Sequence, residues 1–181
     1  MQVIGIAGGS GAGKSTLARA LAEALGERVT LIHLDTYFLP GSPTMNRPEA
    51  IDPAQVAADL DRLAAGETVV RAARRGGELR YEPRPLVLLE GHLLFCYPEL
   101  VERLALRIWV EMDDDERVAR RLGRVTGGGD DFKRAIDWYL SDAKPGYDRF
   151  IGPSKAQADL SVRGDGDPRR LALLLKLIEA L

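Results

Sequence analysis

The chain has a single cysteine, few aromatic residues and no long hydrophobic run, and these shortages exclude several classes of protein. One cysteine, Cys96, in 181 residues excludes a disulfide framework and indicates a reducing compartment. No apolar stretch approaches the roughly 20 residues that span a bilayer. The apolar N-terminus lacks the basic leader of a signal peptide. The sequence therefore predicts a soluble, cytoplasmic protein without a membrane partner.

The chain also lacks an excess of charge of either sign. Its 25 Lys and Arg oppose 27 Asp and Glu, and the net charge of −2 is far from the basic balance of a typical nucleic-acid binder. The hydrophobic share of 45% is large enough to build a core. We therefore expect one domain over residues 1–181 and no nucleic-acid partner, and the sequence carries no indication of the oligomeric state.

Short apolar runs alternate with longer amphipathic stretches, which is the pattern of βαβ units around a parallel sheet. The same periodicities predict strands at 3–7, 29–34, 86–89, 106–112 and 160–162, and helices at 15–25, 53–65, 113–122, 131–143 and 169–181. Three segments, 36–52, 71–85 and 123–130, are expected to be irregular and to surround a site. The predicted fold class is α/β, a five-stranded parallel sheet with helices on both faces.

The most specific motif is a Gly-x-x-x-x-Gly-Lys-Ser phosphate-binding loop between the first predicted strand and helix. Its residues are Gly8, Gly9, Ser10, Gly11, Ala12, Gly13, Lys14 and Ser15, followed by Thr16. The glycines let backbone N–H groups surround a phosphate, Lys14 reaches the β- and γ-oxygens, and Ser15 supplies a hydroxyl to Mg²⁺. The alternative is a Gly-rich turn that only caps the helix. The motif predicts ATP and Mg²⁺ as cofactors.

Two acidic residues at strand ends indicate which phosphate chemistry follows. A GTPase needs an Asn-Lys-x-Asp motif, yet the only asparagine, Asn46, precedes an arginine; a motor ATPase needs a longer chain. A small kinase remains. Asp35 ends a predicted strand where parallel sheets bind ligands, and is the candidate general base, although a local Asx turn is equally consistent. Glu90 ends a second predicted strand and is the candidate carboxylate for Mg²⁺. The alternative is that Glu90 is only a solvated acid at the end of that strand. The adjacent His92 is expected to be structural.

Four arginines recur at helical spacing around the predicted helix 113–122: Arg117, Arg120, Arg121 and Arg124. Pairs at i,i+4, Asp113 with Arg117 and Glu116 with Arg120, would stabilise an exposed helix. Arg121 and Arg124 have no such acid upstream and precede a glycine-rich stretch. We interpret residues 121–130 as a lid that closes on phosphate, with a solvated helix face as the alternative.

Together these motifs resemble the phosphoribulokinase/uridine kinase family of P-loop kinases, above all the uridine kinases. Asp35–Phe38 is similar to the segment with the family's catalytic Asp, Glu90–Phe95 to its Glu-Gly-x-Leu-Leu-Phe, and Lys144–Asp159 to the uridine kinase pattern. The resemblance implies that Arg121 and Arg124 contact the phosphates. It further implies nucleotide contacts in the adenine-side loop at Arg163, Asp165 and Asp167, and acceptor contacts at Tyr37, Phe38, Asn46 and Arg47.

The chain departs from the uridine kinase pattern where the nucleoside should bind. Asn46 and Arg47 replace the family's Asp and His, and the segment that reads uracil is shortened to an arginine-rich stretch with Arg71, Arg74 and Arg75. Glu90–Tyr97 also resembles nicotinamide riboside kinases. We expect ATP-dependent phosphorylation of a small-molecule hydroxyl, first of all the 5′-OH of a nucleoside. A kinase for another metabolite, such as an anionic one, and an ATP-binding regulator with weak catalysis stay open. For a nucleoside, a carboxylate restored at position 46 is expected to improve the use of uridine.

Overall fold

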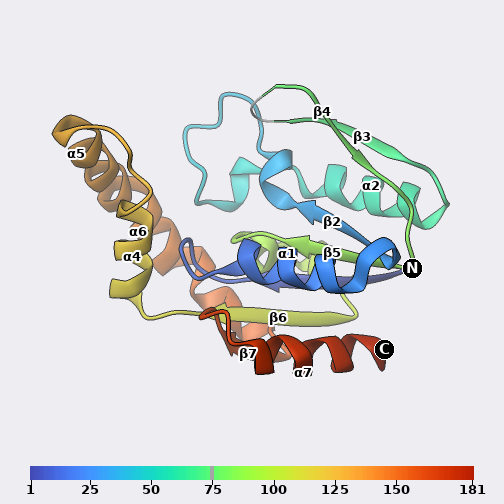
Figure 1. The fold of residues 1–181 in the computed structure, drawn as a ribbon. Helices are drawn as coiled ribbons and strands as arrows, with labels where there is room; N and C mark the ends of the chain where they lie inside the picture. The colour runs from blue at the N-terminus through green and yellow to red at the C-terminus, as the bar shows by residue number, and fades with distance from the viewer. Residues whose placement is uncertain (74–75) are drawn as a thin grey trace.

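The computed structural model describes residues 1–73 and 76–181, and within them a five-stranded parallel sheet is covered by helices on both faces (Figure 1). In spatial order the strands are β2 (Val29–His33), β5 (Leu86–Glu90), β1 (Gln2–Ala7), β6 (Leu106–Glu111) and β7 (Leu160–Arg163). Every neighbouring pair is parallel. The predicted fold class is thus confirmed, and the carboxyl ends of all five strands meet at one edge.

The two faces of the sheet bury separate cores because side chains alternate along each strand. The helices are α1 (Lys14–Leu25) and α7 (Pro168–Glu179) on one face, and α2 (Pro53–Ala64) and α3 (Pro98–Val101) on the other. Ile4 packs in the core of the first face and its neighbour Val3 in that of the second. Burial on both sides explains why the strands read as continuous apolar runs.

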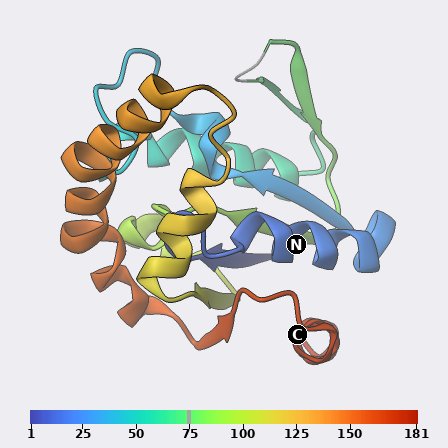
Figure 2. The same cartoon turned by 60° about the vertical axis from the view of Figure 1, so that its left-hand side comes forward.

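Helices also stand beyond the carboxyl ends of the strands (Figures 1 and 2). After α4 (Asp114–Leu122), residues 123–128 lead into a continuous helix over 129–151, here called the edge helix. It comprises α5 (Gly129–Trp138), a π-helical turn, α6 (Lys144–Gly146) and a second π-helical turn. Such π turns are rare and frequently occur at functional sites.

A β-hairpin occupies part of the segment 71–85, which was expected to be irregular. β3 (Val69–Ala72) pairs antiparallel with β4 (Glu78–Tyr81), and Tyr81 is buried against the core. Gly76–Gly77 adopts positive φ angles of 89° and 85°, which only glycine reaches without strain. A Gly-Gly pair between two alternating runs is a hairpin signal, so this expectation was wrong because the turn chemistry was overlooked.

The other predicted elements are confirmed to within two residues at each end, with one exception. The helix expected over 131–143 begins at Gly129 and does not end at Ala143, because it continues through α6 and the second π-helical turn to Ile151. No helix in the described part of the chain combines the length and the hydrophobicity that a bilayer crossing requires.

Candidate active site

The phosphate-binding loop forms a tight cradle between β1 and α1. Gly8, Gly11 and Gly13 have φ angles of 141°, 86° and 102°. A Cβ at Gly11 would lie 2.6 Å from the carbonyl oxygen of Arg117, and one at Gly13 would lie 2.8 Å from that of Gly164. Side chains are therefore excluded at these positions, and α1 begins directly after the cradle at Lys14. Such a cradle fits the phosphates of a nucleotide.

Lys14 and Ser15, the first residues of α1, face the carboxyl edge of the sheet. The Lys14 ammonium is buried and donates a hydrogen bond of 3.0 Å to the Gly9 carbonyl oxygen across the loop. Burial lowers the pKa of Lys14, and the charges of Glu90 and Asp35 only partly oppose this. Ser15 donates its hydroxyl to Glu90 Oε1 at 2.9 Å. The lysine and the metal-binding pair predicted from the sequence thus lie together.

Glu90 is buried at the end of β5, where His33 of β2 is its partner in the register. His33 Nδ1 lies 2.6 Å from Glu90 Oε1, and this hydrogen bond raises the pKa of His33. Burial alone would raise the pKa of Glu90, but the hydrogen bond with His33 and the charge of Lys14 lower it. Glu90 therefore stays ionised, and the solvated-acid alternative is wrong. His33 is a member of the site that sequence reasoning missed.

The donor set of Ser15 and Glu90 fits Mg²⁺. Hydroxyl and carboxylate oxygens are its preferred ligands, and it takes the rest of its shell from phosphates and water. Within residues 1–73 and 76–181 no group of three or more His, Cys, Asp or Glu forms a metal site. A Mg²⁺ ion at Ser15 and Glu90 would therefore take its remaining ligands from a nucleotide and water.

Asp35 lies in the turn that follows β2, with its side chain 54% exposed. His92 Nδ1 is 3.8 Å away, while His92 Nε2 donates to the Met45 carbonyl oxygen at 2.7 Å. Burial lowers the pKa of His92, so the ring is neutral and Nδ1 carries no proton. In the described residues the Asp35 carboxylate accepts no backbone hydrogen bond, so the Asx turn does not form. Asp35 is open to a substrate proton.

The two arginines predicted for the lid, Arg121 and Arg124, line the same pocket as the phosphate-binding loop. Arg121 stacks 4.0 Å over the Trp138 ring and donates to Ser10 Oγ at 2.5 Å. Burial, and then the nearby charge of Arg124, lower the pKa of Arg121. Arg124 is exposed. Both cations face the phosphate side, while closure of a lid over residues 121–130 stays a prediction.

The other two arginines do not form the helical pairs expected of them. Arg117 is buried over the ring of Tyr147 at 3.9 Å and donates to Asp114 at 2.6 Å instead of pairing with Asp113. Arg120 donates to the Gly164 carbonyl oxygen at 3.0 Å. The sequence assigned both to a solvated face because helical spacing does not show what packs against the helix.

A cleft of about 740 Å³ joins the phosphate-binding loop to the acceptor side. Of the predicted residues outside the loop, those that line it are Asp35, Phe38, Asn46, Glu90, Arg121 and Arg124. Arg19 and Trp138 also line it and were not predicted. The cleft therefore holds cations beside the loop and two carboxylates, Asp35 and Glu90.

Two of the predicted acceptor residues point elsewhere. Tyr37 is buried, and its hydroxyl donates to Asp59 at 2.9 Å beneath the hairpin. Arg47 is exposed, with Nη1 4.0 Å from Glu49. Arg71 donates to the same Asp59, away from the cleft. The predicted Arg74 and Arg75 lie outside the described residues.

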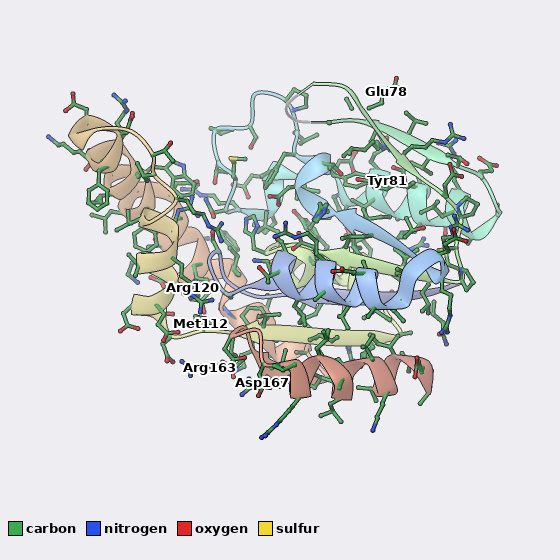
Figure 3. The ribbon with its side chains drawn as sticks, in the orientation of Figure 1. Glu78, Tyr81, Met112, Arg120, Arg163 and Asp167 are labelled. Carbon is green, nitrogen blue, oxygen red and sulfur yellow. The ribbon has the colours of Figure 1, made fainter. Side chains whose placement is uncertain are left out.

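The adenine-side loop meets the phosphate-binding loop through its backbone rather than through the predicted side chains. Figure 3 shows Arg120, Arg163 and Asp167 gathered where α4, β6 and β7 meet. Arg163 is paired with Asp113 at 2.9 Å, and Asp165 with Arg170 at 2.5 Å. Asp167 caps α7 by accepting from the Arg169 N–H. Arg120 also holds this loop, by donating to the Gly164 carbonyl oxygen.

Asn46 is buried at the acceptor end of the cleft, and its partner was not predicted. Its Nδ2 donates a hydrogen bond of 2.6 Å to Oδ2 of Asp142, which lies 96 positions later in the chain. Neither residue belongs to a local motif with the other, so nothing in the sequence indicated the contact.

Comparisons with known proteins show which proteins the chain resembles. A family model described as an AAA domain matches residues 4–137. Uridine kinases from Halobacterium salinarum and Chloroflexus aurantiacus are each 34% identical to the chain; the alignments cover 98% of it and 86% and 94% of those relatives. A phosphoribulokinase from Rhodobacter spheroides superposes with a TM-score of 0.63 at 15% identity, over 88% of this chain and 68% of that one. The last likeness shows the P-loop kinase fold alone.

Proposed function

Since the chain belongs to the AAA-domain P-loop proteins and, among them, to the uridine kinase family, we propose that it transfers the γ-phosphoryl group of ATP to the 5′-hydroxyl of a nucleoside, with uridine and cytidine as the first acceptors to test. The observation that carries the proposal is the single cleft that holds the phosphate cradle and the Ser15–Glu90 pair at one side and Asp35 with Asn46 at the other. A kinase needs its phosphate-binding groups and its acceptor-binding groups in one cleft, because the acceptor hydroxyl has to be aligned with the γ-phosphate that it attacks.

On the donor side, the cradle and Lys14 bind the phosphates. Ser15 and Glu90 would hold Mg²⁺, which supplies neutralisation of the charge on the β- and γ-oxygens. The hydrogen bond from His33 orients the Glu90 carboxylate by occupying Oε1. Arg121 and Arg124 add cations where charge develops on the transferring group.

On the acceptor side, Asp35 takes the proton. Its carboxylate lies in the cleft without a competing hydrogen bond from the described backbone, so an acceptor hydroxyl can donate to it. As the oxygen attacks, the proton passes to Asp35, and such a base typically contributes about 10²–10⁴-fold to the rate. Because Asp35 and Glu90 are both in place, the arrangement supports an enzyme rather than a regulator with weak catalysis.

An anionic acceptor is less well supported than a nucleoside. Two of the arginines that suggested it from the sequence lie among the described residues: Arg71 is engaged with Asp59, and Arg47 is exposed at the surface. The acceptor end of the cleft instead contains Asp35 and the Asn46–Asp142 pair. A negatively charged acceptor would meet repulsion there.

The test is ADP release from ATP with a panel of nucleosides, sugars and phosphosugars. We expect turnover with a nucleoside, a loss of about 10²–10⁴-fold in kcat for Asp35→Asn with little change in the KM for ATP, and a loss of both ATP binding and turnover for Lys14→Ala. Glu49→Gln, which removes an exposed acid outside the cleft, is the matched control.

Two results would overturn parts of the proposal. Turnover on an acidic metabolite but on no nucleoside would show that the acceptor is not a nucleoside. If Asp35→Asn turned over as fast as the parent, Asp35 would not be the general base.

A further inference from the structure

Asp142 binds the chain segment that carries Asn46 with both of its carboxylate oxygens. Thr44 Oγ1 donates to Oδ1 at 2.5 Å, Asn46 Nδ2 donates to Oδ2 at 2.6 Å, and the Met45 N–H approaches Oδ2 at 3.4 Å. Asp142 lies in the first π-helical turn of the edge helix, Tyr139–Ala143. Three consecutive residues of the acceptor segment, 44–46, are therefore held by a single side chain.

The same segment is held from its other side as well. His92 donates from Nε2 to the Met45 carbonyl oxygen at 2.7 Å. A Cβ at Gly146, one turn after Asp142, would lie 2.3 Å from the Asn46 carbonyl oxygen. The segment is thus clamped between the sheet and the edge helix, and Asn46 is only 3% exposed although it lines the cleft.

These contacts determine which way the Asn46 amide faces. Its oxygen cannot lie against Asp142, because two acceptors would then meet at hydrogen-bond distance. Partial burial would raise the pKa of Asp142, but the hydrogen bonds from Thr44 and Asn46 outweigh it and lower the pKa. Asp142 is therefore charged at neutral pH, and Nδ2 is committed to it. Asn46 Oδ1 is left to accept from a ligand.

We propose that Asp142 is a positioning residue that fixes the Asn46 carboxamide with its oxygen toward the cleft, so that the pair recognises a hydroxyl group of a neutral, sugar-like acceptor. The proposal rests on the proposed function and narrows its acceptor class. Asn46 binds the hydroxyl, and the negative charge behind it polarises the amide and strengthens the bond. A phosphate or carboxylate placed against Asn46 Oδ1 would meet an acceptor with the charge of Asp142 behind it.

The first experiment separates acceptor binding from ATP binding. Steady-state kinetics of Asp142→Ala should show a KM for the nucleoside raised about tenfold, the effect expected for one lost charge-assisted hydrogen bond. The KM for ATP should stay within about twofold of the parent, because Asp142 does not line the nucleotide side. Asp137→Asn on α5, which removes an exposed acid from the same helix, is the matched control and should behave as the parent.

The second experiment exchanges the two groups. Asn46→Asp alone places two carboxylates where a 2.6 Å hydrogen bond existed, so kcat/KM for the nucleoside should fall. The exchange of both residues, Asn46→Asp with Asp142→Asn, restores a donor and an acceptor in that contact and should recover activity relative to Asn46→Asp. A residue that only stabilises the fold would not produce this reciprocal rescue.

Several outcomes contradict the proposal. An unchanged nucleoside KM in Asp142→Ala, or improved use of uridine by Asn46→Asp alone, would show that Asp142 does not orient Asn46. If Asp142→Ala does not fold by circular dichroism, the exchanged pair decides the question, because it conserves volume and total charge. A parent enzyme inactive on every nucleoside would instead reject the proposed function, a result distinct from an active parent with an indifferent Asp142.

Discussion

The arginine of the hairpin, Arg71, offers a direct test of whether the arginine-rich segment binds substrate or supports the fold. Arg71 Nε donates to Asp59 Oδ2 at 2.5 Å, and the Tyr37 hydroxyl donates to the same oxygen at 2.9 Å. The Asp59 side chain is 1% exposed, while that of Arg71 is 25% exposed. Asp59 Oδ1 has no partner among the described residues. Arg71→Ala would therefore leave a buried carboxylate without the only cation that pairs with it among the described residues.

The magnitude follows from this burial. Removing one partner of a buried ion pair costs roughly 3–5 kcal/mol. The partial exposure of Arg71 admits water, so we expect the lower end, about 3 kcal/mol in the free energy of unfolding. For a chain of this size, 1 kcal/mol corresponds to roughly 2–4 °C in Tm, which gives a decrease of about 6–12 °C. The pair carries no catalytic group, so kcat and both KM values should be unchanged at low temperature.

The assay is thermal unfolding combined with steady-state kinetics at 20–25 °C. Arg80→Ala on β4 is the matched control, because Arg80 is exposed and its pair with Glu82 should contribute at most about 1 kcal/mol. Adding Asp59→Asn to Arg71→Ala should recover part of the lost Tm, since no buried charge then remains. The reasoning is refuted if Arg71→Ala unfolds at the temperature of the parent, or if it raises the KM of the acceptor.

Two further predictions concern the phosphate side. Glu90→Gln should raise the Mg²⁺ concentration needed for half-maximal activity about tenfold or more, because Ser15 and His33 then contact an uncharged amide; an unchanged Mg²⁺ titration would remove Glu90 from the metal site. Arg124→Ala should lower kcat more than it raises the KM for ATP, because this exposed cation acts on charge that develops during transfer; kinetics equal to those of the parent would return Arg124 to the solvated face.

The nucleotide side of the site could be predicted from the sequence because its parts are local. The loop, the strand before it and the helix after it are contiguous, so Lys14 and Ser15 follow from one motif. Asp35 and Glu90 come from different strands, but parallel strands end at a common edge, which places both acids near the loop. His33 could have been added by the same rule, since it stands opposite Glu90 in the register.

The acceptor side could not be predicted because its contacts are distant in the chain. Periodicity predicted a helix over 131–143, but not that a π-helical turn directs Asp142 toward residues 44–46. Helical spacing likewise paired Arg117 and Arg120 with nearby acids, whereas in the structure Arg117 packs over the Tyr147 ring and Arg120 donates to the Gly164 carbonyl oxygen. The family resemblance implied that Tyr37 contacts the acceptor, but the hairpin beneath which its hydroxyl binds Asp59 was not foreseen.

The long-range contact also changes what the departure at position 46 means. Taken alone, the replacement of a carboxylate by Asn46 suggests a weakened hold on a sugar hydroxyl. With Asp142 behind the amide, the negative charge is not lost but moved one hydrogen bond further from the acceptor. A charge at that distance still favours a hydroxyl donor, and it still repels an anion. The substitution is therefore compatible with a nucleoside acceptor. A carboxylate at position 46 is expected to improve the use of a nucleoside only when the carboxylate of Asp142 is replaced as well.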